Sequence, residues 1–204
     1  MEGRASAVEP FRTWTGLVAI LDRANVDTDQ IIPKRFLKSI ERTGFASALF
    51  ADWRFRADGA EEPGFVLNHA RYRGATVLVA GPNFGCGSSR EHAAWALRDY
   101  GIRAIVAPSF ADIFRANCVE NGLVTAEAAE ADVRQLMAMV ERHEGLQATV
   151  DLEAQTIQAD AAAPFPFLIA DASRERLRKG ADAIAMTLER EAAIRRYEAT
   201  LVGA

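Results

Sequence analysis

The sequence predicts a mixed α/β fold in a single domain that spans residues 1–204. The main observation is a strand, a glycine-rich turn, a helix and a second strand that follow one another over 75–107. This is the order of a βαβ unit, which has parallel strands and a right-handed crossover. A second observation is a pair of short strands at 148–158 with the pattern of a hairpin. A chain of 204 residues that is 50% hydrophobic and 25% charged also suits one globular domain.

The chain before the βαβ unit is expected to be mostly irregular. One apolar, β-branched segment predicts a strand, and a proline predicts the start of a short helix because its fixed φ suits the first helical position. The expected elements are a flexible tail at 1–12, a strand at Thr13–Leu21, an acidic turn at 22–30, a short helix after Pro33 that carries Phe36 and Leu37, and an irregular segment at 41–70 with at most one helix near 46–53.

The βαβ unit itself is the clearest prediction. Ala75–Ala80 and Ile102–Ala107 are apolar runs typical of buried strands. Gly81–Gly87 forms the turn, and the helix is expected at Ser88–Tyr100, with Gly101 as the residue that ends it.

The rest of the chain predicts helices and short strands in alternation. Helical spacing of apolar residues and terminal glycines mark the helices, and a turn at Glu153-Ala154 marks the hairpin. The expected elements are a helix at Ser109–Glu120 with Ser109 in a capping box, a helix at Glu130–His143, a hairpin of Ala148–Leu152 and Thr156–Gln158, and a strand at Phe165–Ala170. A C-terminal helical segment follows at 171–204, with Asp171 as its cap and an interruption at Gly180. Its last part carries an apolar stripe formed by Ile184, Leu188, Ile194, Tyr197 and Leu201.

The scarce cysteines and histidines limit the metal chemistry of this chain. The sequence holds two cysteines, Cys86 and Cys118, and three histidines, at 69, 92 and 143. None of these residues forms a C-x-x-C or H-x-x-x-H pair. Counting therefore excludes a four-cysteine zinc or iron–sulfur site within this chain, and we expect no metal ligand here.

Charge and apolar patterning exclude other classes. A net charge of −4 argues against general binding to nucleic acid or anionic membranes. No apolar run is long enough to span a membrane, and residues 1–10 are too charged for a signal peptide. Two isolated cysteines give no disulfide framework, so we expect a cytoplasmic protein.

The best chemical signal is the segment from Gly81 to His92, at the carboxyl end of a predicted parallel strand. Open α/β sheets bind ligands at that edge, and free N–H groups at a helix start favour an anion. Arg90 adds a planar guanidinium whose N–H donors suit a carboxylate or phosphate. These features predict an anion site at Gly87–Arg90.

A purely structural interpretation of the same segment stays open. Ser88 and Glu91 match the S-x-x-E capping box, which stabilises a helix without any catalysis. Two nucleotide motifs fail, because Arg90 occupies the third glycine position of G-x-G-x-x-G and no G-K-[ST] ending follows.

Other candidate residues are weaker on their own. Asp27 and Asp29 could act as paired acids or simply form a turn. Cys86 could be activated by the helix start, although no histidine adjacent in sequence serves it as a base, and His92 could simply be packed. A solvated basic rim is the simplest interpretation of Lys34, Arg35, Arg42, Arg71 and Arg73.

Six motifs together resemble one known family. In chain order they are Asn25–Pro33 (NVDTDQIIP), Arg42–Phe45 (RTGF), Asp52–Phe55 (DWRF), Asn83–Ala93 (NFGCGSSREHA), Ala107–Phe114 (APSFADIF) and Asp151–Gln155 (DLEAQ). This set resembles the bacterial-type small subunits of 3-isopropylmalate dehydratase, in the aconitase superfamily, and the likeness extends from about Thr13 to Tyr197.

The resemblance implies a fold, a reaction and a partner. The fold is the swivelling β/β/α domain of aconitase as a separate chain. The reaction is the interconversion of 2- and 3-isopropylmalate through isopropylmaleate in leucine biosynthesis. A large subunit would hold the 4Fe–4S cluster, whose open iron would act as a Lewis acid on the leaving hydroxyl. The chain would then be active only in a heteromer.

The resemblance also implies roles for individual residues. Ser88 would be the alkoxide base that removes a proton from the carbon next to a carboxylate. Gly87, Ser89 and Arg90 would hold the substrate carboxylate, and Asp29 would support the active site. These roles suit a helix start with N–H donors, because such donors stabilise an anion.

Substrate choice and the partner interface are further expectations. The family's recognition loop falls at Phe36 and Leu37, where an apolar pair would suit an isopropyl group, although both could be core residues. A related hydroxy-diacid, such as homoaconitate or a methyl-substituted malate, and a non-catalytic anion-binding module remain alternatives. Five aromatic residues suggest that the 41–70 segment contacts the partner: Phe45, Phe50, Trp53, Phe55 and Phe65.

Overall fold

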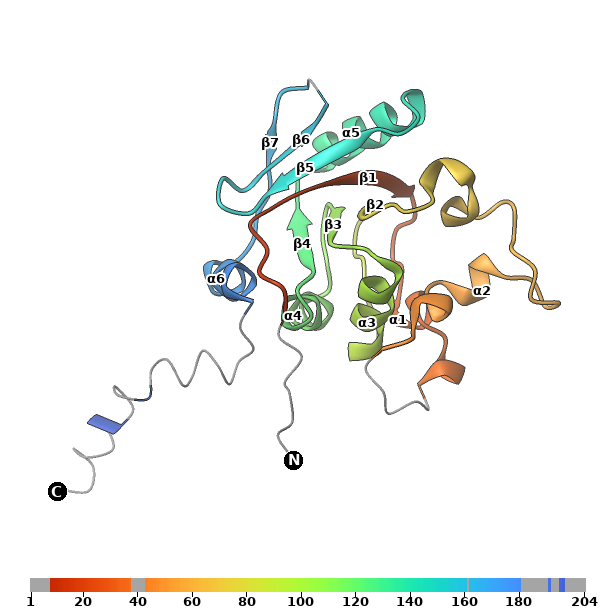
Figure 1. The fold of residues 1–204 in the computed structure, drawn as a ribbon, viewed down its shortest axis with the longest axis horizontal. Coiled ribbons are helices and arrows are strands. Elements are labelled where there is room, and N and C mark those ends of the chain that lie inside the picture. The colour runs from red at the N-terminus through yellow and green to blue at the C-terminus, as the bar shows by residue number, and fades with distance from the viewer. Residues whose placement is uncertain (1–7, 38–42, 161, 181–190, 192–194, 197–204) are drawn as a thin grey trace.

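A computed structural model describes residues 8–37, 43–160, 162–180, 191 and 195–196. These residues form a seven-stranded mixed sheet in the order β4-β3-β2-β1-β5-β6-β7 (Figure 1). Its strands are β1 (Thr13–Leu21), β2 (Val77–Ala80), β3 (Ala104–Ala107), β4 (Val124–Glu127), β5 (Gln147–Asp151), β6 (Thr156–Ala159) and β7 (Phe165–Pro166).

The long central strand β1 joins a parallel half of the sheet to an antiparallel half. Its Val18–Leu21 stretch pairs in parallel with β2, and its Thr13–Leu17 stretch pairs antiparallel with β5. β2, β3 and β4 continue the parallel half, whereas β6 and β7 continue the antiparallel half. All four residues of β2 and of β3 are buried, which explains their continuous apolar sequences.

The longer helices of the described residues are α3 (Glu91–Tyr100), α4 (Asp112–Glu120), α5 (Glu130–Arg142) and α6 (Asp171–Lys179). α5 packs against β1, β2 and β3, whereas α3 contacts α4 and α4 contacts α6. Figure 1 shows α5 above β1, and α3, α4 and α6 below it. α5 buries Val133, Leu136, Met137 and Val140, the apolar stripe that predicted this helix.

Short helices build the segment between β1 and β2: α1 (Thr28–Ile31), η1 (Lys34–Phe36), η2 (Ala46–Ala48), α2 (Ala51–Arg54), η3 (Val66–Asn68) and η4 (Ala70–Tyr72). The Phe50 and Trp53 rings stack with their centroids 5.7 Å apart, and Phe65 packs against both. Phe45, Phe50 and Phe65 are buried. These three side chains therefore belong to the core of this chain, whereas Trp53 and Phe55 are partly exposed, and the partner interface expected at 41–70 stays a prediction.

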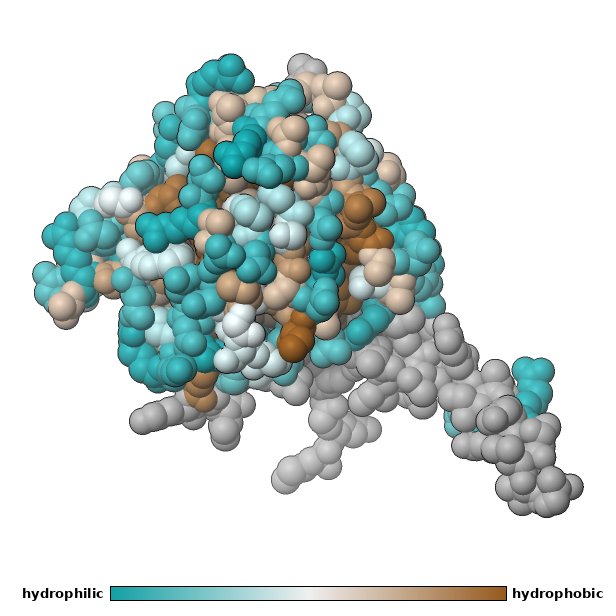
Figure 2. All heavy atoms as spheres, turned by 180° about the vertical axis from the view of Figure 1, so that it is seen from behind, coloured by the Kyte–Doolittle hydropathy of each residue, from teal (hydrophilic) through white to brown (hydrophobic). Residues whose placement is uncertain are grey.

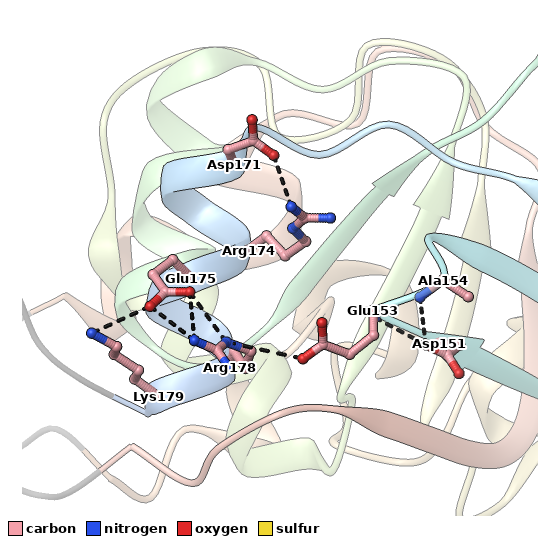
Figure 3. Close-up of polar contacts among 8 residues, drawn as sticks. All are labelled: Asp151, Glu153, Ala154, Asp171, Arg174, Glu175, Arg178 and Lys179. Atoms are coloured by element: carbon pink, nitrogen blue, oxygen red, sulfur yellow. Dashed lines mark hydrogen bonds and ion pairs between the residues drawn. The ribbon is translucent and has the colours of Figure 1, made fainter.

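α6 is linked to the turn between β5 and β6 and to the N-terminal segment. Arg178 pairs with Glu175 at 2.9 Å and lies 3.9 Å from Glu153 (Figure 3). In the turn itself, the Asp151 carboxylate accepts hydrogen bonds from the backbone N–H groups of Glu153 and Ala154. The Phe11 N–H donates to the Leu177 carbonyl at 2.8 Å, and Phe11 is buried. Phe11 thus anchors the described end of the segment expected as a flexible tail, whereas residues 1–7 lie outside the described residues.

The structure confirms most of the expected elements and corrects several of them. The mixed α/β class, the parallel βαβ unit and the hairpin are confirmed. Asp171 is the first residue of α6 rather than its cap, and β7 is shorter than expected. β4 was not predicted, because its sequence VTAE is short and ends in a charge. The stripe residues Ile184, Leu188, Ile194, Tyr197 and Leu201 lie outside the described residues.

The surface is largely hydrophilic on the face shown in Figure 2, where hydrophobic residues form small separate patches. Ile113 and Leu168 are the large hydrophobic side chains classed as exposed in the described part of the chain. Within that part, no helix has the length and apolar character that crossing a bilayer requires.

Candidate functional site

Three loops meet at the carboxyl edge of the parallel strands. They follow β1, β2 and β3, and this edge is where open α/β sheets bind ligands. The Phe84 N–H donates to the Ser109 carbonyl at 3.1 Å, and the Asn83 N–H donates to the Ser109 hydroxyl at 2.8 Å. Ser109 therefore joins the second and third loops. It does not cap α4, whose first turn begins after Ala111, so the predicted Ser109 capping box is wrong.

The first and second loops pair as a short extension of the parallel sheet. The Asn25 N–H donates to the Pro82 carbonyl at 2.9 Å, and the Gly85 N–H donates to the Val26 carbonyl at 2.7 Å. The Thr28 N–H then donates to the Cys86 carbonyl at 2.9 Å. These bonds hold α1 against the glycine-rich loop.

Two glycines are required by this geometry. Gly85 has a φ of +78°, and an added Cβ would lie 2.1 Å from the Phe114 ring. Gly87 has a φ of +91°, a left-handed conformation that side-chain-bearing residues rarely adopt. The glycine-rich loop can therefore turn and approach both α1 and α4 closely.

Ser88 and Ser89 lie at the open end of this loop, and both are exposed. Among the described residues, the Ser88 hydroxyl has no hydrogen-bond partner. The same is true of the backbone N–H groups of Gly87, Ser88 and Ser89, which donate to no protein acceptor. Three free donors before a helix start favour an anion at this position.

The predicted Ser88–Glu91 capping box is wrong. α3 begins at Glu91, so the N-cap residue is Arg90, and it makes no capping bond through its side chain. The helix therefore starts three residues later than expected. The Ser88 side chain lies in the loop before α3, and helix capping does not occupy its hydroxyl.

Asp29 and Arg90 form an ion pair between α1 and the start of α3. The Arg90 side chain is only 9% exposed, whereas that of Asp29 is 42% exposed. The hydrogen bond from Arg90 lowers the pKa of the Asp29 carboxyl from its usual value of 3.8, and the charges of Arg90 and Lys34 act in the same direction. The Lys34 ammonium lies 4.0 Å from the other Asp29 oxygen. The structure thus brings these two predicted site residues together.

Asp27 has a different role from Asp29. It caps α1, because its carboxylate accepts the Gln30 N–H at 2.7 Å while the Gln30 side chain accepts the Asp27 N–H at 3.0 Å. This reciprocal capping box explains the acidic turn after β1. Asp27 and Asp29 therefore do not act as a pair of acids.

Phe36 and Leu37 lie at the end of η1 and are half-buried against the core. The Arg35 guanidinium lies over the Phe36 ring at 4.8 Å and pairs with Asp52 at 2.5 Å. Phe36 and Leu37 thus follow the buried Pro33 and are partly exposed, and the Arg35 side chain covers part of the Phe36 ring.

The structure favours the structural interpretation of two other candidates. Burial, reinforced by the Asp27 carboxylate, raises the pKa of the Cys86 thiol, which disfavours the thiolate that a nucleophilic cysteine needs. His92 packs with its ring centroid 4.5 Å from that of Trp95 and 5.5 Å from that of Phe45. It is a packed histidine.

Lys34, Arg35 and Arg73 of the expected basic rim are exposed, although each lies near an acidic partner. Arg35 pairs with Asp52, Arg73 pairs with Glu61 at 3.0 Å, and the Arg71 guanidinium donates to the Val140 carbonyl at 2.7 Å. Arg42 lies outside the described residues. In the described ranges, no three histidine, cysteine or acidic side chains gather as a metal site.

Sequence reasoning missed two polar features of the site. Thr28 is buried, and its hydroxyl donates to the Ser88 carbonyl at 2.8 Å. Asn25 and Asn83 both have positive φ, and the Asn83 amide donates to the Asn25 side-chain oxygen at 2.8 Å. Asparagine tolerates this left-handed conformation, so the two asparagines were the one feature of the sequence that could have indicated these turns. The pairing of residues 58 positions apart could not be deduced from spacing.

Comparisons with known proteins agree with the motif resemblance. A family model described as the aconitase C-terminal domain matches residues 8–131, and a model described as LeuD_N matches residues 134–171. The 3-isopropylmalate dehydratase small subunit of Shewanella amazonensis is 52% identical over 196 residues, covering 95% of this chain and 98% of that protein. The protein of the same name from Shewanella sp. strain W3-18-1 is 50% identical over 198 residues, covering 96% and 98%.

The fold matches a solved structure as well. The crystal structure of 3-isopropylmalate dehydratase (leuD) from Methanocaldococcus jannaschii has a TM-score of 0.65 and 28% sequence identity. The match covers 91% of this chain and 99% of that chain. With half of its residues shared with curated relatives along nearly its whole length, the chain belongs to the family of 3-isopropylmalate dehydratase small subunits.

Proposed function

We propose that this chain supplies the proton-transferring half of a hydro-lyase that interconverts 2- and 3-isopropylmalate through isopropylmaleate, a reaction of leucine biosynthesis. The observation that carries the proposal is an exposed Ser88 flanked by free backbone N–H donors, in a chain of this family. The names of the relatives favour isopropylmalate over homoaconitate or a methyl-substituted malate.

Ser88 is the base in this mechanism. Its Oγ, as an alkoxide, takes the proton from the carbon next to a substrate carboxylate while hydroxide leaves the neighbouring carbon and a C=C bond forms. Ser88 returns that proton to the other carbon when hydroxide adds in the opposite orientation. A serine alkoxide is unfavourable in water, so it needs nearby donors. The Ser88 N–H, which has no protein acceptor in the described structure, and the positive end of α3 favour such an anion.

Gly87, Ser89 and Arg90 hold the substrate carboxylate. The N–H groups of Gly87 and Ser89 have no protein acceptor in the described structure, and Arg90 carries a guanidinium with several donors. Asp29 keeps that guanidinium in place from α1. Phe36 and Leu37, both partly buried, would contact the isopropyl group.

The residues of this chain do not fit a 4Fe–4S cluster. The sequence holds two cysteines, of which Cys118 is fully buried, and the described residues contain no group of three suitable ligands. We therefore assign the cluster to the large subunit. Ser88 and Ser89 are also exposed, so the partner must cover them to exclude water from the site. Free cysteines further suit a heteromer in the reducing cytoplasm.

Anaerobic reconstitution tests this function. The purified chain and its large subunit are assayed alone and mixed, and isopropylmaleate absorbance is followed. We expect turnover only in the mixture, with kcat/KM for isopropylmalate well above that for homoaconitate. Turnover by this chain alone, or a preference for homoaconitate, would overturn the proposal. Ligand binding by the isolated chain without turnover of the mixture would instead support a non-catalytic anion-binding module.

A further inference from the structure

Thr28 makes contacts that the proposed chemistry has not yet used. It is the first residue of α1 and is only 2% exposed. Its N–H donates to the Cys86 carbonyl at 2.9 Å, and its hydroxyl donates to the Ser88 carbonyl at 2.8 Å. One buried residue therefore binds two alternate carbonyls of the glycine-rich loop.

These two bonds fix the direction of two peptide groups. In a trans peptide the C=O and the following N–H point in opposite directions, and the described chain contains no cis peptide. Because the carbonyls of Cys86 and Ser88 point toward Thr28, the N–H groups of Gly87 and Ser89 point away from it. Both of these N–H groups are without a protein acceptor in the described structure.

The residue between the two carbonyls fits the same arrangement. Gly87 has a φ of +91°, and an added Cβ would lie 3.4 Å from the Asp27 Cβ and 3.7 Å from the Thr28 hydroxyl oxygen. The glycine lets the chain bend close to Asp27 and Thr28. The Ser88 peptide depends on the Thr28 hydroxyl for the hydrogen bond that holds its carbonyl.

We propose that Thr28 is a positioning residue that orients Ser88 and the Ser89 N–H for the reaction. Thr28 does not touch the substrate and acts through the Ser88 carbonyl. This inference rests on the proposed role of Ser88 as the base. Donors that are fixed before the reaction stabilise developing charge without reorganisation, so their loss lowers kcat more than it raises KM.

The test replaces the hydroxyl with a methyl group. Thr28→Val keeps the shape of the side chain and removes one donor, whereas Thr28→Ser keeps the donor. Thr125→Val is the matched control, because Thr125 is also buried and its hydroxyl has no hydrogen-bond partner in the described structure. All variants are assayed as the reconstituted heteromer, with circular dichroism and thermal unfolding as checks of folding.

We expect Thr28→Val to lower kcat by about tenfold, the factor that corresponds to about 1.4 kcal/mol, with KM changed by less than about threefold. Thr28→Ser and Thr125→Val should keep kcat within about threefold of the natural chain. A Thr28→Val enzyme with unchanged kcat, or a Thr28→Ser enzyme equally impaired, would overturn the inference. If the valine variant does not fold, Thr28→Ala removes the same hydroxyl and is judged by the same criterion.

The outcome of this test separates two failures. If the heteromer with the natural chain turns over isopropylmalate and Thr28→Val matches it, the positioning role fails while the proposed function stands. If the natural heteromer shows no turnover, the proposed function itself fails.

Discussion

Replacing Asp29 with asparagine removes the negative charge that faces Arg90. The Arg90 side chain is 9% exposed and that of Asp29 is 42% exposed, so this ion pair is neither fully buried nor fully solvated. Breaking a buried pair costs about 3–5 kcal/mol, whereas an exposed pair contributes about 0–1 kcal/mol. Since solvent screens Asp29, we expect Asp29→Asn to lower the free energy of unfolding by about 1.5 kcal/mol. For a chain of this size that corresponds to a fall in Tm of about 3–6 °C.

The effect should depend on pH in a defined direction. Arg90 lowers the pKa of Asp29 below 3.8 in the folded chain. The stabilisation is therefore fully present above the unfolded pKa of about 3.9, and it is lost as the pH falls through the folded value. Urea unfolding of both chains between pH 3 and pH 7 measures this. The difference in unfolding free energy should stay constant from about pH 5 to pH 7 and shrink toward pH 3.

Asp52→Asn is the matched control for this experiment. Asp52 pairs with Arg35 at 2.5 Å, yet both side chains are more than half exposed. The control should therefore lower the unfolding free energy by no more than about 1 kcal/mol. Equal effects of the two substitutions, or an Asp29→Asn effect that is the same at every pH, would refute the argument from Arg90 burial.

Two further predictions concern the glycine-rich loop. Gly85→Ala should lower the unfolding free energy by at least about 3 kcal/mol, because its Cβ would overlap the Phe114 ring at a φ of +78°; urea denaturation checks this, and a loss below about 1 kcal/mol would contradict it. Cys86 should react slowly with iodoacetamide at pH 7 and faster as the pH rises, because burial and Asp27 raise its thiol pKa. The fully buried Cys118 should stay unlabelled in the folded chain. Mass spectrometry identifies the labelled sites, and rapid labelling of Cys86 at pH 7 would contradict the raised pKa.

The sequence predicted the elements that local pattern determines. β2 and β3 are continuous apolar runs, and α5 has helical spacing of its buried residues, so their types could be deduced without tertiary information. The glycine-rich turn could be placed because a glycine cluster follows an apolar strand. The position of Ser88 at the carboxyl edge of the parallel strands followed from this βαβ pattern.

The parts of the site that could not be predicted depend on contacts between segments far apart in the sequence. Ser88 and Glu91 match a capping box in sequence, yet α3 begins only at Glu91 and the Ser88 carbonyl accepts a hydrogen bond from the distant Thr28 hydroxyl. The Asp29–Arg90 pair joins residues 61 positions apart, and no spacing rule reveals it. Family resemblance supplied the roles of these residues, whereas the structure supplied their contacts.

The proton-transfer role of Ser88 is tested most directly by kcat of the heteromer that carries Ser88→Ala. The side chain is exposed and without a hydrogen-bond partner in the described structure, so folding and association should be unchanged. Ser173→Ala, on α6, is the control for a serine-to-alanine change outside the site loops. We predict that Ser88→Ala lowers kcat by about 10³-fold or more, as expected for loss of a catalytic base, while Ser173→Ala has no effect. A Ser88→Ala heteromer that keeps more than about a tenth of the natural kcat would contradict the assignment of Ser88 as the base.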